Sequence, residues 1–106
     1  MHYALHNAAE SLYVDMEGDF TFNNSDVFRH IMRSMLAAND IHPLNTVHFD
    51  MSHLTRMDSS ALDMLLDAIS FAKRHHQRLT LEHPRGQVEQ KLKAAAQCNA
   101  NLVIVQ

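Results

Sequence analysis

A turn of three polar residues, Asp58-Ser59-Ser60, stands directly before a long amphipathic segment. Each of these residue types caps the amino terminus of a helix well, and a helix needs only one cap. The backbone amides and the dipole at that end of a helix favour a negatively charged phosphate. The turn is therefore the first candidate for a functional site, and two hydroxyl groups are available in it.

Two kinds of catalytic chemistry fit the residues poorly. A serine hydrolase presents its nucleophile in a Gly-x-Ser-x-Gly turn, whereas Met57 and Ala61 stand at the glycine positions around Ser59. A two-component receiver would use Asp50 as its phosphoacceptor, but it also needs a lysine after its last strand, and no lysine follows Lys93. We therefore expect a binding module and not an enzyme, with a small hydrolase as the weakest alternative.

The histidines and the cysteine give no metal-binding pattern. The chain has nine histidines, but neither an H-E-x-x-H motif nor a paired Cys/His spacing is present. His75 and His76 follow a predicted helix, where they are expected to interact with its last carbonyl groups. We expect no metal and no cofactor. The single Cys98 excludes a disulfide framework and is typical of a reducing cytoplasm.

Periodicity indicates the elements that must position the turn. Alternating apolar residues predict strands around residues 12–16, 47–51 and 79–81, and a short edge strand reaches Ala8. Apolar spacings of three and four predict helices near residues 25–39, residues 59–75 and after Pro84-Arg85-Gly86, the second being the longest. We expect the first full strand to end at Gly18-Asp19 and residues 52–57 to form a loop. The apolar run Leu102–Val105 predicts a last strand that is buried on both faces.

The order strand, helix, strand, helix, strand predicts an α/β fold with parallel strands. Ligands and partners of such sheets bind at the carboxyl ends of the strands, which is where Asp58-Ser59-Ser60 lies. A length of 106 residues allows one domain, residues 1–106, and a 46% hydrophobic share is typical of a folded chain.

Charge and hydropathy narrow the function further. A net charge of −3 argues against nucleic-acid binding, although residues 71–106 are basic and residues 1–70 acidic. No signal peptide and no apolar stretch of membrane-spanning length is visible, so we expect a cytoplasmic protein without direct membrane insertion.

The segment Val47–Leu62 resembles the core motif of the STAS domain: an apolar strand, Asp-Met-Ser, a short loop, and Met-Asp-Ser-Ser opening a helix. Gly18-Asp19-Phe20-Thr21-Phe22 resembles the family's turn before its first helix, and the helix at Gly86-Gln87-Val88 and the strand Leu102–Val105 follow in the family's order. The resemblance covers almost the whole chain. It implies a mixed central sheet with parallel βαβ units, packed by three or four helices.

The resemblance also implies a mechanism, because stand-alone proteins of this kind are similar to bacterial anti-sigma-factor antagonists. These bind an anti-sigma factor that is a serine kinase, which switches them off by phosphorylation, and a serine phosphatase reverses the reaction. The phosphoacceptor would be Ser59, with Ser60 as the alternative. The implied partner-binding residues are Asp19, Thr21, Thr55, Asp58, Ser59, Ser60, Ala61 and Met64.

Departures from the family pattern leave a rival function open. The glycine that usually follows the serines is Ala61, and a frequent aspartate in the upstream turn is Thr21. Other STAS proteins resemble non-phosphorylated subunits of lipid-trafficking ABC transporters, bound to the ATPase.

On the helix after Ser59, Met64 and Phe71 lie opposite the main apolar stripe, which predicts either packing under a neighbour or an exposed partner-binding seam. A homodimer is also compatible with the sequence.

Overall fold

Five strands form one sheet in the order β1-β2-β3-β4-β5 in a computed structural model that describes residues 1–106. The strands are β1 (His2–Ala8), β2 (Ser11–Phe20), β3 (Thr46–Met57), β4 (Arg78–Glu82) and β5 (Ile104–Val105). β1 pairs antiparallel with β2, and every other neighbouring pair is parallel. The predicted α/β class with a mixed sheet is confirmed.

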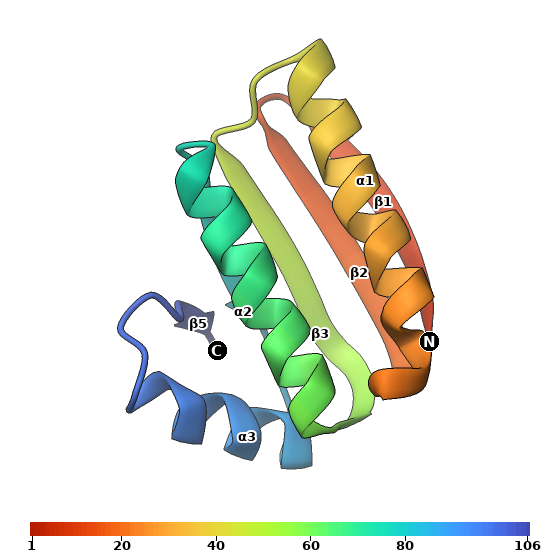
Figure 1. Ribbon diagram of the computed structural model, residues 1–106, viewed down its shortest axis with the longest axis vertical. Coiled ribbons are helices and arrows are strands. Elements are labelled where there is room, and N and C mark those ends of the chain that lie inside the picture. Colours follow the sequence, from red (N-terminus) through yellow and green to blue (C-terminus); the bar gives the residue numbers. More distant parts are fainter.

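Three α-helices connect the parallel strands: α1 (Ser25–Ile41), α2 (Ser59–Arg74) and α3 (Gly86–Ala96). A short 3₁₀ turn, η1 (Phe22–Asn24), precedes α1. Figure 1 shows α1 and α2 lying over the same face of the sheet, with α3 crossing near the start of α2. None of these helices has the length and hydropathy that a membrane-spanning segment requires.

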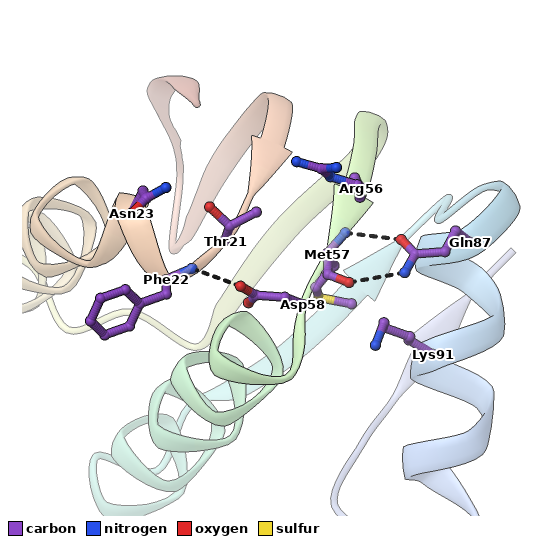
Figure 2. Close-up of a pocket in the computed structure, with 8 residues that line it drawn as sticks. All are labelled: Thr21, Phe22, Asn23, Arg56, Met57, Asp58, Gln87 and Lys91. Carbon is purple, nitrogen blue, oxygen red and sulfur yellow. Dashed lines mark hydrogen bonds between the residues drawn. The ribbon is translucent and has the colours of Figure 1, made fainter.

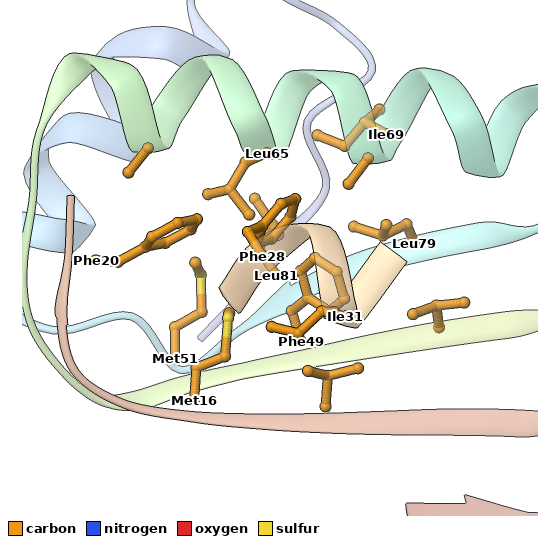
Figure 3. Packing of buried hydrophobic residues seen from close by; sticks show 14 of the residues in the cluster. Met16, Phe20, Phe28, Ile31, Phe49, Met51, Leu65, Ile69, Leu79 and Leu81 are labelled. Atoms are coloured by element: carbon orange, nitrogen blue, oxygen red, sulfur yellow. The ribbon is translucent and has the colours of Figure 1, made fainter. Parts of the chain in front are cut away.

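The core lies between the sheet and the two long helices. Val47, Phe49 and Met51 alternate along β3 and are fully buried under Ile31 of α1 and Leu65 of α2. Figure 3 shows Phe49 and Met51 packed together with Met16 and Phe20 of β2. Because the intervening residues point to the other side, the sheet has one apolar face and one polar face.

Two strands are longer than the sequence predicts. β2 continues through Gly18 to Phe20, and β3 continues through the expected loop to Met57, pairing Phe20 with Met57. The register between them shifts at Asp15/Glu17 and again at Gly18/Asp19, where Gly18 has a φ of 94°. Such bulges interrupt the period-two alternation, so the pattern that predicts a strand is lost where the strand continues.

Two further expectations need correction. α1 with 17 residues is slightly longer than α2 with 16. β5 has only two residues, one half-buried and one exposed, since it lies at the open edge of the sheet and not within it.

Candidate functional site

The side chain of Asp58 joins the turn before α1 to the start of α2. Its Oδ1 atom accepts a hydrogen bond from the Ala61 N–H at 2.8 Å, which caps α2. Its Oδ2 atom accepts a second from the Phe22 N–H at 3.0 Å, drawn in Figure 2. Both carboxylate oxygens are thus engaged within the chain. Asp58 therefore positions the neighbouring serines in addition to contributing charge.

These hydrogen bonds hold the pKa of Asp58 below its usual value. The N–H of Phe22 contributes most and the N–H of Ala61 next, because both favour the ionised carboxylate, and the charge of Lys91 acts in the same direction. A fixed negative charge consequently stands at the amino terminus of α2, where the helix dipole stabilises it.

The two serines differ in accessibility. Ser59 is the first residue of α2 and is exposed, whereas Ser60 is half-buried. Neither hydroxyl group makes a hydrogen bond within the chain. The Ser59 hydroxyl is therefore the more accessible of the two from solvent.

The ends of β2 and β3 bring two more predicted site residues together. The Thr55 hydroxyl donates a hydrogen bond to Asp19 Oδ1 at 2.6 Å, and Arg56 forms an ion pair with Asp19 Oδ2 at 3.2 Å. Thr21 directly follows the last residue of β2, and its hydroxyl donates to Asn24 Oδ1 at 3.3 Å. Because the Arg56 and Asp19 side chains are largely exposed, their ion pair contributes only ~0–1 kcal/mol to stability.

Ala61 and Met64 occupy different positions from the exposed residues. The Ala61 side chain is completely buried in the core, so it offers no surface to a partner. Met64 is half-buried and lines a groove of about 250 Å³ between α1 and α2, beside Phe28 and Met32. Phe71 is also half-buried, with its ring 4.3 Å from that of His75. Met64 and Phe71 are therefore neither fully buried under a neighbouring element nor fully exposed as a partner-binding seam.

A shallow pocket of about 430 Å³ lies beside the Asp58 turn (Figure 2). Eight residues from three segments line it: Thr21, Phe22, Asn23, Arg56, Met57, Asp58, Gln87 and Lys91. The Gln87 amide binds both backbone groups of Met57, accepting from its N–H at 3.0 Å and donating to its C=O at 3.1 Å. A side chain of α3 thus fixes the last residue of β3, directly before Asp58.

Six residues of this pocket are absent from the sequence-based site: Phe22, Asn23, Arg56, Met57, Gln87 and Lys91. Phe22 is 66% exposed, an unusual environment for a large aromatic side chain. The sequence does contain a signal for Phe22. It is an aromatic residue between two polar ones, Thr21 and Asn23, where the apolar alternation has already ended. The sequence contains no such signal for Gln87 and Lys91, because only the folded chain brings α3 to the end of β3.

The other face of the sheet has its own polar cluster. The Tyr13 and His48 rings stack at 4.4 Å, and His48 hydrogen-bonds to Glu82 and to Thr80. Burial raises the pKa of Asp50 on this face, but hydrogen bonds from Ser52 outweigh it and hold that pKa below the usual value. Nowhere do three or more His, Cys, Asp or Glu side chains gather as a metal site.

Comparisons with known proteins agree with this architecture. A family model described as Mlab, STAS domain, matches residues 4–99. No curated protein matches the chain. Among solved structures, the unphosphorylated form of the anti-sigma factor antagonist SpoIIAA is similar, with a TM-score of 0.74 and 15% identity over 99% of this chain and 88% of that one.

Two further solved structures show how widely the fold occurs. An anti-sigma factor antagonist from Mycobacterium paratuberculosis has a TM-score of 0.79 at 10% identity, covering 98% of this chain and 84% of that one. A murine anion transporter of the solute carrier 26 family has a TM-score of 0.73 at 18% identity, covering 93% of this chain but 16% of the transporter. At these identities the similarity establishes a common fold.

Proposed function

The chain belongs to the STAS-domain family, and from this premise we propose that it is a bacterial, cytoplasmic anti-sigma-factor antagonist. In this proposal the chain binds an anti-sigma factor with serine kinase activity and is switched off by phosphorylation of Ser59. A serine phosphatase restores it. The chain supplies a binding surface, and its partners supply the catalysis.

The observation that carries this proposal is the environment of Ser59. Its hydroxyl is exposed at the first position of α2, beside a carboxylate whose two oxygens are both held by backbone N–H groups. The exposed Phe22 ring lies on the adjoining pocket. An aromatic anchor next to a modifiable hydroxyl is suited to binding that a modification can abolish, because aromatic residues often dominate interface energies.

A phosphate on Ser59 would weaken binding without unfolding the chain. It adds about −1.5 to −2 charge at neutral pH. The amino terminus of α2 tolerates this charge. The ionised Asp58 is adjacent, however, and Asp63 is exposed one turn further along α2. A partner packed on this surface would therefore face repulsion and the cost of desolvating several negative charges.

The experiment is phosphorylation by a candidate anti-sigma kinase and ATP, followed by intact-mass analysis. The wild type is expected to gain one phosphate, Ser59→Ala none, and Ser60→Ala one. Phosphate uptake by Ser59→Ala but not by Ser60→Ala would move the acceptor to Ser60. No uptake by the wild type from any kinase encoded beside it would contradict the switch.

One alternative is favoured by two specific observations. The matching family model carries the name Mlab and not that of an antagonist. The position of a frequent family aspartate is occupied by Thr21, whose hydroxyl is engaged with Asn24. The alternative is a non-phosphorylated STAS subunit that binds the ATPase of a lipid-trafficking ABC transporter. Stable co-purification with such an ATPase, together with an unmodified Ser59, would establish it over the kinase-regulated function.

A further inference from the structure

β1 forms an unprotected edge of the sheet. It pairs only with β2, and all seven of its residues are exposed. In an antiparallel pair, every second residue of an edge strand directs its N–H and C=O groups away from its neighbour. These groups provide a template for a further strand.

The residues of this edge lack the features that normally prevent such pairing. Residues 1–9 contain no Asp, Glu, Lys, Arg, Pro or Gly. Charged residues and proline are the usual means of blocking an edge strand. Tyr3 and Leu5 are also exposed, at 37% and 38%, and lie on the same face of the strand. The edge thus lacks Asp, Glu, Lys and Arg side chains, carries apolar side chains and has unpaired backbone groups.

The opposite edge of the sheet offers little length for pairing with this strand. β5 has only two residues, so a head-to-tail contact between copies would pair β1 over a very short length. Two β1 strands, in contrast, offer seven residues each and can pair about a two-fold axis. A two-fold contact of this kind uses the same surface on both copies and closes after two chains. The edges therefore favour a dimer over an open chain of subunits.

We propose that the protein forms a homodimer in which the β1 strands of two copies pair antiparallel, joining their sheets into one continuous sheet. Full overlap of residues 2–8 places Leu5 opposite Leu5 of the second copy. His2 then lies opposite Ala8 and His6 opposite Ala4, so no histidine faces another across the interface. The proposal involves neither Ser59 nor the pocket beside Asp58, and it stands apart from the proposed function.

The first test is the mass in solution by light scattering and sedimentation. The wild type is expected at twice the 12.1 kDa of one chain, and Leu5→Lys at one chain. The matched control is Leu36→Lys, a leucine of similar exposure on α1, which keeps the dimer. A monomeric wild type would overturn the proposal. Loss of the dimer in Leu36→Lys but not in Leu5→Lys would also overturn it, because it places the interface on α1.

The second test does not depend on disrupting the strand. Opposite Cα atoms in an antiparallel pair lie ~4.5–5.5 Å apart, which suits a disulfide. In a Cys98→Ser background, Leu5→Cys is expected to cross-link to itself under mild oxidation, whereas Asn7→Cys alone is not. A mixture of Tyr3→Cys and Asn7→Cys is expected to form the mixed disulfide. Cross-linking of Asn7→Cys to itself without that of Leu5→Cys would overturn the proposed pairing.

Discussion

The backbone N–H of Phe22 donates a hydrogen bond to Asp58 Oδ2 at 3.0 Å, across 36 residues of sequence. The other oxygen of the same carboxylate caps α2 through the Ala61 N–H. One side chain therefore couples the end of β2 to the start of the helix that presents Ser59. This connection holds the backbone of Phe22 at Asp58, the residue directly before the exposed Ser59.

Removing this carboxylate is expected to loosen both segments. Asp58→Ala lowers the melting temperature and accelerates hydrogen exchange at the Phe22 and Ala61 amides, because each loses its acceptor. Asp58→Asn retains an oxygen acceptor and has the smaller effect. Asp63→Ala, an exposed position on the same helix, serves as the control and leaves both amides unchanged. Equal exchange rates in all three variants would contradict the coupling.

The lowered pKa values of Asp58 and Asp50 predict how stability depends on pH. A carboxyl group with a folded pKa below its unfolded value, about 3.9 for Asp, stabilises the fold above that unfolded value. This stabilisation disappears as the pH falls through the folded pKa. Melting temperatures measured downward from pH 6 should therefore decline below about pH 4. The decline should be shallower in Asp58→Asn than in the wild type, whereas Asp63→Asn should decline as the wild type does.

The contact between α3 and β3 is testable through Gln87. Gln87→Ala removes two hydrogen bonds to the Met57 backbone. We expect the unfolding free energy to fall by only about 1 kcal/mol, because water reaches this exposed side chain and replaces part of the interaction. Gln87→Glu accepts from the Met57 N–H but cannot donate to its C=O, so an intermediate loss is expected. Urea denaturation measures both. Gln90→Ala, exposed on the same helix, should show no such loss, because alanine favours a helix at least as well as glutamine. An equal loss there would contradict the role of the Met57 contact.

A phosphate mimic separates folding from binding. Ser59→Asp is expected to remain folded, with stability changed by no more than about 0.3–1 kcal/mol, because a negative charge suits the first turn of α2. Partner affinity, measured by calorimetry, should nevertheless fall. Ser70→Asp adds the same charge at an exposed position near the far end of α2 and should leave affinity unaltered. Equal affinity of Ser59→Asp and the wild type would contradict the mechanism.

The pocket predicts a binding role for Phe22. Phe22→Ala should reduce partner affinity by roughly 30-fold, the effect of losing an interface anchor worth about 2 kcal/mol. Stability should change little, because the ring is 66% exposed. Ile41→Ala, at 76% exposure on the far end of α1, provides the control and should bind normally. Reduced binding in Ile41→Ala alone would move the partner surface away from the pocket.

Local patterns in the sequence determined the order of the elements and the place of the candidate site. Alternation at Val47, Phe49 and Met51, followed by the spacing of apolar residues after Ser59, was enough to predict a strand, a helix and the turn between them. Each pattern involves residues close together in the chain, and burial of one face imposes it directly. The parallel βαβ order followed from the same patterns.

Only the tertiary structure decided what surrounds Ser59. The bulges near Gly18 extend β2 and β3 beyond their alternating segments, because a bulge satisfies pairing while breaking the period of two. Gln87 and Lys91 reach the site through a contact between α3 and the end of β3, 30 residues apart in the case of Gln87. No local pattern encodes such contacts, since they arise from the packing of elements that the sequence specifies separately.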